Sequence, residues 1–347
     1  MKKILIYGAN GYTGRLILEE AFSRNLSITI AGRNELEILK LSEEYNVACE
    51  VFALDEREKM LRVLNSHDVV IHCAGPFMYT AMPMVKACLE TSTHYLDITG
   101  EYQIFEQIHD LDEAAKTANV MLMPGAGFDV VPSDCLAAKL KEQMPDATDL
   151  KLAFTSVGGG LSRGTSKTMV EGSHEGQQYR RGGKLETKSL GTSFREIDFG
   201  AMKQLSVGIS WGDIATAYFS TGIPNIEVFT GSSAKQIIQL KWMGRLSFLL
   251  KMRWVKNFLK KQVDKKRPGP SAEKRGAGKM YLWGQASNGQ TAVESRLTTP
   301  NGYTLTAKTA VLIASKIVND DYKAGYQTPA MAYGSGLILE INGTEFS

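Results

Sequence analysis

The chain has 347 residues, of which 43% are hydrophobic and 22% are charged, and its net charge is +3. This is the composition of a soluble globular protein of about two domains. It excludes a membrane-spanning protein, because no uncharged apolar stretch approaches the roughly 18 residues that a span needs. The four scattered cysteines lack a C-x-x-C pair and the N-terminus does not resemble a signal peptide, so we expect a cytoplasmic protein without disulfides.

The N-terminal segment carries the clearest motif. An apolar strand is predicted over residues 3–7, a helix over 12–24 and a second strand over 27–31, and Gly8, Gly11 and Gly14 lie between the first strand and the helix. In a βαβ unit, three glycines so spaced allow a tight turn, approach of the backbone to a pyrophosphate, and close packing of the helix on the strand. The segment therefore predicts a dinucleotide-binding site.

The residue at the end of the second strand selects the nucleotide. NAD-binding proteins place an acidic residue there to bind the ribose 2′-hydroxyl. This chain has Arg33, followed by Asn34. A guanidinium pairs with a 2′-phosphate, so we expect NADP(H) to be the cofactor.

Residues 1–130 continue as an alternation of strands and helices. Further strands are predicted at 47–54, 68–74, 94–98 and 120–124, with helices at 34–45, 56–65, 80–91 and 102–118. This pattern predicts a doubly wound parallel sheet of the Rossmann type, whose ligands bind beyond the carboxyl ends of the strands. Three glycine-bearing loops follow strands four to six, at 74–77, 97–101 and 124–129.

The pattern changes in residues 131–320, for which we predict an α+β domain with a mixed or antiparallel sheet. A helix should begin near Pro132, strands are expected at 150–157 and 225–230, and Asn288-Gly289 predicts a hairpin of 279–286 with 291–298. A helix is expected at 304–318, and the stretches 158–165 and 180–184 are predicted to be exposed loops. The tail, 321–347, is expected to fold back toward the first domain.

The segment 235–267 holds 11 basic residues and one acid, Asp264, interleaved with apolar residues. The pattern predicts a pair of basic amphipathic helices. Such helices either pack an apolar face into a core or lie on an anionic membrane. No nucleic-acid motif accompanies the charge, so we do not expect nucleic acid as a partner.

The remaining chemistry points to hydride transfer. None of the 13 tyrosines has lysine four residues later, which argues against the short-chain dehydrogenase mechanism, and the five histidines lack the spacing of metal ligands. His72, within a buried strand, is expected to be a hydrogen-bonded core residue. The candidate proton donors at the strand ends are Tyr95, Asp97, Glu101 and Asp129. Asp97 and Glu101 fit a helix cap equally well.

Five segments together resemble the saccharopine dehydrogenase-like oxidoreductases, most closely the branch with trans-acting enoyl reductases. They are Gly8–Gly14, Ala31–Arg33, Cys73–Phe77, Thr93–Glu101 and Pro124–Asp134. The resemblance implies an N-terminal Rossmann domain that binds NADP(H). It implies that the following residues contact the cofactor: Gly8, Asn10, Gly11, Tyr12, Thr13, Gly14, Arg33, Asn34, Ala74, Gly75, Pro76 and Phe77.

Three functions remain open. The first is an NADPH-dependent reductase of an apolar enoyl or carbonyl substrate, which resembles the acyl- or lipid-like substrates of the enoyl reductase branch. The second is a saccharopine- or imine-type reductase of amino-acid derivatives. The third is a non-catalytic NADP-binding or membrane-associated regulator. A homodimer and peripheral membrane contact through 235–267 are compatible with each.

Overall fold

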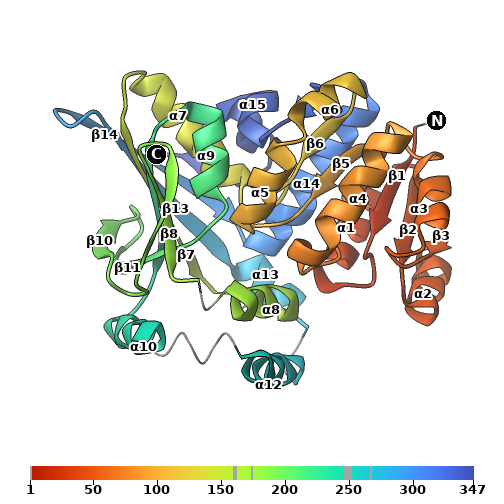
Figure 1. The fold of residues 1–347 in the computed structure, drawn as a ribbon, viewed down its shortest axis with the longest axis horizontal. Coiled ribbons are helices and arrows are strands. Elements are labelled where there is room, and N and C mark those ends of the chain that lie inside the picture. Colours follow the sequence, from red (N-terminus) through yellow and green to blue (C-terminus); the bar gives the residue numbers. More distant parts are fainter. Residues whose placement is uncertain (1, 159–161, 173–174, 246–251, 266–267) are drawn as a thin grey trace. The chain divides into compact units, whose positions relative to one another are not determined.

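The protein is described from a computed structural model, which covers residues 2–158, 162–172, 175–245, 252–265 and 268–347 (Figure 1). The chain divides into two compact units. Unit 1 contains Met1–Val131 and Tyr303–Ala332, and unit 2 contains Pro132–Gly302 and Tyr333–Ser347.

Unit 1 alternates strands and helices, as its apolar runs and helical periodicity predict. Its elements are β1 (Ile4–Tyr7), α1 (Tyr12–Ser23), β2 (Ile28–Gly32), α2 (Glu35–Tyr45), β3 (Ala48–Val51), α3 (Arg57–Leu64), β4 (Val69–His72), α4 (Phe77–Thr91), β5 (His94–Asp97), α5 (Tyr102–His109), α6 (Asp112–Thr117), β6 (Met121–Met123), α14 (Gly302–Val318), β15 (Gly325–Tyr326) and α15 (Pro329–Tyr333). The predicted helix over 102–118 is therefore two helices, α5 and α6.

The strands of unit 1 form one parallel sheet in the order β15-β6-β5-β4-β1-β2-β3. The central strands β1 and β4 are buried along their whole length, as expected for strands covered on both faces. The register places Tyr7 beside His72, and His72 beside Asp97. The carboxyl ends of these strands therefore lie next to one another at one edge of the sheet, where the doubly wound fold binds ligands.

Unit 2 is built around a mixed sheet. Its elements are α7 (Val131–Gln143), β7 (Asp149–Val157), α8 (Arg163–Gly172), β8 (Gln177–Arg181), β9 (Lys184–Lys188), β10 (Phe194–Asp198), β11 (Lys203–Ile209), α9 (Asp213–Thr221), β12 (Asn225–Gly231), α10 (Ala234–Arg245), α12 (Arg253–Asp264), α13 (Ala272–Ala277), β13 (Lys279–Ser287), β14 (Ala292–Pro300), the 3-10 helix η1 (Ser335–Glu340) and β16 (Glu345–Phe346). The main strand order is β10-β11-β12-β7-β13-β14-β16, in which only β12 and β7 run parallel. The predicted hairpin is formed by β13 and β14. The strand order, with one parallel and several antiparallel pairs, confirms the predicted mixed sheet.

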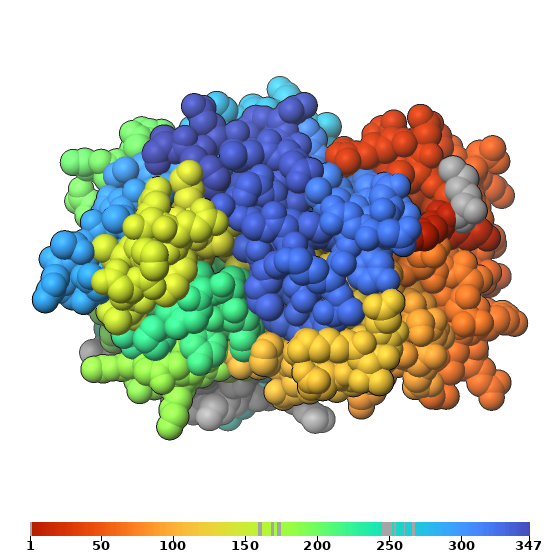
Figure 2. Space-filling view, turned by 90° about the horizontal axis from the view of Figure 1, so that it is seen from above, coloured from red at the N-terminus to blue at the C-terminus, as the bar shows by residue number. Residues whose placement is uncertain are grey.

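The structure differs from the predicted domain division at the C-terminal end. Helix α14, expected in the second domain, belongs to unit 1, as does β15, which pairs with β6. Figure 2 shows this part of the chain, in blue, at the surface beside the red and orange residues of unit 1. The tail also divides, because residues 333–347 belong to unit 2, where β16 pairs with β14.

The two predicted exposed loops of unit 2 are confirmed only in part. Residues 180–184 form the turn between β8 and β9, in which Gly182 and Gly183 both have positive φ. Arg180 is buried there, because its guanidinium donates to the carbonyl oxygens of Ile214 and Gly183. The second loop, predicted over 158–165, ends where α8 begins at Arg163, and its residues 159–161 lie outside the described residues.

Candidate dinucleotide-binding site

The turn between β1 and α1 has the geometry that its three glycines predict. Gly8 has φ +83°, which an L side chain rarely adopts, and its N–H donates to the carbonyl oxygen of Ala31 at 2.7 Å. A Cβ at Gly14 would lie 2.3 Å from the carbonyl oxygen of Gly8, so only glycine allows α1 to pack this closely on the turn. A Cβ at Gly11 would meet only the Gly8 carbonyl oxygen, at 3.2 Å. The backbone at Gly11 is therefore otherwise open to a ligand.

The N-terminus of α1 is electropositive. Its N-cap is Gly11, which supplies no side-chain acceptor, and its first turn contains no acidic residue. The helix dipole and the N-terminal N–H groups thus lack a carboxylate that would compete with a phosphate. The chain fits a dinucleotide pyrophosphate at this position.

The end of β2 lies next to the glycine turn. A Cβ at Gly32 would come within 3.1 Å of Asn10 Oδ1, so the Asn10 side chain borders the start of Gly32–Asn34. Arg33 is exposed and forms no ion pair within the part of the chain that the structure describes. Asn34 instead caps α2, because its Oδ1 accepts from the N–H of Glu37. Of these residues, Arg33 has the charge to bind a phosphate.

The loop after β4 adjoins the glycine turn from the other side. A Cβ at Gly8 would lie 3.0 Å from the Cβ of Ala74, and the Gly75–Pro76 peptide bond is cis. Phe77 begins α4 and is buried. The structure thus brings Gly8 and the 74–77 loop together, as the rule for strand ends predicts.

Glu101 holds the start of α4. Its carboxylate accepts from the N–H of Phe77 at 2.9 Å and from the N–H of Met78 at 2.8 Å. The sequence left open whether Glu101 is a proton donor or a cap of the helix that follows it, and its side chain makes no cap bond to α5. The carboxylate instead accepts from the first N–H groups of α4, a helix that begins more than twenty residues earlier in the chain. It thereby fixes the end of the 74–77 loop.

Tyr95 and Asp97 form a buried pair in β5. The Tyr95 hydroxyl donates to Asp97 Oδ2 at 2.7 Å, while Asp97 Oδ1 accepts from the N–H of Thr99 at 2.9 Å and of Gly125 at 2.8 Å. Burial raises the pKa of Asp97 to about 7. The carboxyl therefore ties the loop after β5 to the loop after β6.

Asp129 lies in the same region; the residue as a whole is partly exposed, but its carboxyl group is buried. Its carboxylate packs against Gly100, where an added Cβ would lie 2.9 Å from Asp129 Oδ2. Burial raises the pKa of Asp129 to about 7 as well. A carboxyl with this pKa is partly protonated near neutral pH, which suits a proton donor.

His72 departs from the prediction of a hydrogen-bonded core residue. Neither ring nitrogen has a hydrogen-bond partner, although the side chain is fully buried. The ring lies 5.5 Å from the rings of Tyr7 and Phe77 and 6.2 Å from that of Tyr95. Burial lowers the pKa of His72 to about 3, so it is a neutral ring in an aromatic cluster.

Two residues of α14 were not predicted to lie at the site. The ring of Tyr303 meets that of Tyr12 edge to face at 5.1 Å, and Thr306 Oγ1 accepts from the N–H of Phe128 at 2.9 Å. Gly127 is needed for this approach, because a Cβ there would lie 2.8 Å from Thr306 Cγ2. The predicted domain division places both residues in the second domain, so it does not bring them to this site.

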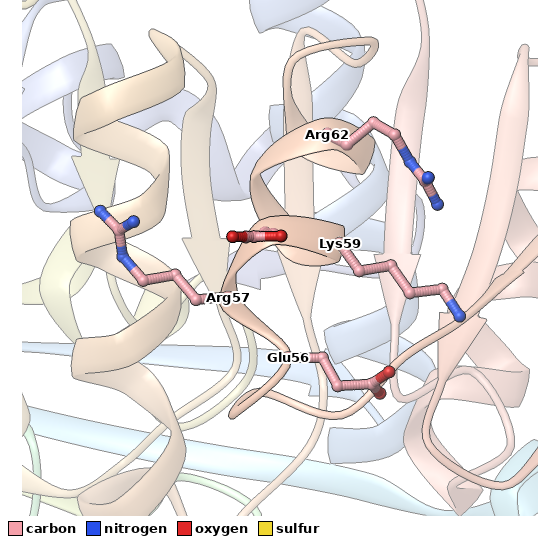
Figure 3. Close-up of a pocket in the computed structure, with 5 residues that line it drawn as sticks. Glu56, Arg57, Lys59 and Arg62 are labelled. Atoms are coloured by element: carbon pink, nitrogen blue, oxygen red, sulfur yellow. The ribbon is translucent and has the colours of Figure 1, made fainter.

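A surface depression on α3 is not part of this region. It is lined by charged side chains from the start of that helix, namely Glu56, Arg57, Glu58, Lys59 and Arg62. Figure 3 shows Arg57 extending to the opposite side of the helix from Lys59 and Arg62. None of the predicted cofactor residues lines it, and we assign it no role.

A family model matches the N-terminal part of the chain, and two relatives match about half of the chain. Residues 4–123 match the family model of the saccharopine dehydrogenase NADP binding domain. A mouse saccharopine dehydrogenase-like oxidoreductase is 28% identical over 200 residues, which are 49% of this chain and 45% of the relative. A putative trans-acting enoyl reductase from Mycobacterium tuberculosis is 28% identical over 181 residues, 48% of this chain and 43% of the relative. The matches thus cover less than half the length of these relatives.

Solved structures extend the likeness to the whole fold. Apo saccharopine dehydrogenase (L-Glu forming) from Saccharomyces cerevisiae superposes with a TM-score of 0.67 at 12% identity, over 98% of this chain and 96% of that one. Homospermidine synthase from Legionella pneumophila gives 0.63 at 10% identity, over 100% and 91%. At such identities the likeness concerns the fold, which is a Rossmann-like unit and a mixed-sheet unit.

Among the described residues, no helix is long and apolar enough to cross a membrane. The matched segment, residues 4–123, is an NAD(P)-binding domain. The chain is accordingly similar to the saccharopine dehydrogenase-like oxidoreductases, through an N-terminal domain of the saccharopine dehydrogenase NADP-binding type.

Proposed function

We propose that the protein is an NADPH-dependent oxidoreductase that transfers a hydride to an apolar enoyl or carbonyl substrate. The observation that carries this proposal is the glycine turn at the uncapped N-terminus of α1, with Arg33 beside it at the end of β2. The reduced nicotinamide, when bound, supplies the hydride. The glycine turn binds the pyrophosphate, and the residues of the 74–77 loop contact the rest of the cofactor.

The choice of NADPH rests on Arg33. An exposed guanidinium that forms no ion pair with the described residues is available for two charge-assisted hydrogen bonds to a 2′-phosphate. A ribose 2′-hydroxyl offers it no charge. NADPH should therefore bind more tightly than NADH, and the difference should depend on this side chain.

Among the four candidate donors, we assign the proton transfer to Asp129. Tyr95, Asp97 and Glu101 use their polar atoms to hold the loops after β4, β5 and β6. Asp129 is partly exposed and has a raised pKa, so it can hold a proton near neutral pH. We infer that it gives this proton to the substrate atom that becomes negative as the hydride arrives.

The substrate class is inferred from the names of the relatives. The Mycobacterium tuberculosis relative carries the name of a trans-acting enoyl reductase, which favours an acyl- or lipid-like enoyl substrate. The saccharopine dehydrogenase names of the other relatives favour an imine or amino-acid derivative. A panel of enoyl thioesters and imino acids, with NADPH oxidation followed at 340 nm, separates the two. Tight NADPH binding without turnover of either class would favour the non-catalytic regulator.

The first experiment is a calorimetric titration with NADPH and NADH. Arg33→Ala should weaken NADPH binding by about ten- to a hundredfold, which is the loss expected when a hydrogen bond to a charged group is removed. The affinity for NADH should not change. The matched control is Arg24→Ala, at the far end of α1, where the guanidinium pairs with Glu20. Equal loss in both variants, or no binding of either nucleotide to the wild type, would refute the proposal.

A further inference from the structure

The helices α10 and α12 expose large apolar side chains to solvent. On α10, the exposed fractions are 56% for Ile238 and 59% for Trp242, and on α12 the fraction is 57% for Phe258. Met243 and Met252, the residue preceding α12, are exposed as well. We call these five residues the α10–α12 surface. Both helices lie at the same lower edge of unit 2 in Figure 1.

These side chains are exposed because another face of each helix is already packed. On α12, Val263 is buried, and Lys256 Nζ lies 3.3 Å from a carboxylate oxygen of Glu171 on α8. On α10, Ile237 is buried. The inward faces hold the helices in unit 2, so the exposed residues are not needed for the core.

The charge around the α10–α12 surface is positive. Eleven basic residues lie between 235 and 267, and those that the structure describes as exposed are Lys235, Lys241, Lys261 and Lys265. The single acid of the segment, Asp264, is paired with Lys167 at 2.6 Å. Part of the segment, at 246–251 and 266–267, lies outside the described residues. The described part combines exposed apolar side chains with four exposed lysines that form no ion pair among the described residues.

We propose that the α10–α12 surface docks the protein on an anionic lipid membrane. Two helices that expose aromatic and aliphatic side chains among lysines suit a bilayer surface, in which negatively charged headgroups cover apolar acyl chains. Trp242 and Phe258 enter the boundary between headgroups and acyl chains, and the lysines meet the lipid phosphates. This docking does not depend on the function of unit 1 as a nucleotide-binding domain.

The test is co-sedimentation of the full chain with vesicles of phosphatidylcholine alone and with 30% phosphatidylglycerol. We expect binding to the anionic vesicles only, and loss of binding at 1 M salt, where the Debye length is about 3 Å. Lys261→Glu with Lys265→Glu should lower the affinity by roughly twentyfold or more, because each basic residue near the surface contributes about fivefold. Trp242→Ser with Phe258→Ser should lower it by about tenfold, because less apolar area is buried.

Matched controls carry the same changes at exposed positions of unit 1. Leu36→Ser removes a side chain that is 80% exposed on α2, and Lys40→Glu reverses an exposed charge on the same helix. Vesicle binding equal in the control and α10–α12 variants would overturn the proposal, as would equal binding to neutral vesicles or none to either. Sedimentation velocity without lipid provides a further test. If the wild type is a dimer and Trp242→Ser with Phe258→Ser is a monomer, the surface binds a second copy of the chain and the proposal is refuted.

Discussion

The buried carboxyl of Asp97 makes a measurable prediction for the pH dependence of stability. Burial raises its pKa from 3.8 to about 7 in the folded chain. Between these values the folded state binds more protons at this site than the unfolded state, so the free energy of unfolding falls as the pH rises. The stabilising contribution is complete below pH 3.8 and is lost as the pH passes through 7. A shift of this size corresponds to about 4 kcal/mol in total.

Asp97→Asn removes the titration and keeps the contacts. The amide oxygen can accept from the N–H groups of Thr99 and Gly125, and the amide nitrogen can donate to the Tyr95 hydroxyl. From pH 5 to pH 8, the wild type should therefore lose roughly 2–3 kcal/mol of stability relative to the variant. Comparing the two proteins cancels the titration of other groups, including His72, whose lowered pKa acts in the opposite direction.

The assay is urea denaturation at pH 5, 6, 7 and 8, followed by circular dichroism. Tryptophan fluorescence is unsuited to unit 1, because all four tryptophans lie in residues 211–283. Glu58→Gln, an exposed change on α3, is the control for loss of one negative charge. A difference between wild type and Asp97→Asn that stays constant from pH 5 to pH 8 would refute the assignment of a buried, largely protonated carboxyl.

Three further predictions concern other residues. Gly14→Ala should abolish nucleotide binding in calorimetry and lower the unfolding free energy by about 1–3 kcal/mol, because its Cβ would collide with the Gly8 backbone; an unchanged affinity would contradict this. Glu101→Gln should destabilise the fold by about 1–2 kcal/mol in urea denaturation, since it loses a charged acceptor at the α4 N-terminus; unaltered stability would argue against that role. Labelling of the native protein with a dithionitrobenzoate reagent should be fastest at Cys49, because burial raises the pKa of the other three thiols, and Cys49→Ser should remove the fast phase; a fast phase that persists would contradict this.

The fold of residues 4–123 could be predicted because its determinants are local. Each strand is a short apolar run, and each helix has its own periodicity, so the parallel sheet follows from their alternation. The return of α14 to unit 1 could not be predicted in this way. It depends on contacts such as that of Thr306 with the N–H of Phe128, which join residues 178 positions apart. No local pattern in a single sequence specifies such a pair.

The same limit applies to side-chain environments. Arg180 follows a polar stretch and precedes two glycines, which is the pattern of an exposed loop. In the structure its guanidinium is buried, because the β8–β9 turn places it over the ring of Tyr218 at 4.2 Å, with two backbone carbonyls as acceptors. The His72 ring likewise lacks a hydrogen-bond partner because three aromatic side chains from other elements surround it.

The candidate donors show why acidic residues at strand ends are ambiguous in sequence. Asp97 and Glu101 each accept from two backbone N–H groups, and those groups belong to the loops after β4, β5 and β6. Glycine-rich loops expose such N–H groups and need acceptors, so carboxylates at strand ends are expected even where no proton is transferred. A carboxylate that holds loops should affect stability when replaced, and one that transfers a proton should affect turnover and its pH profile. By this criterion, Asp129→Asn should lower kcat and remove an ionisation near pH 7 from its pH profile, whereas Glu101→Gln should act first on stability.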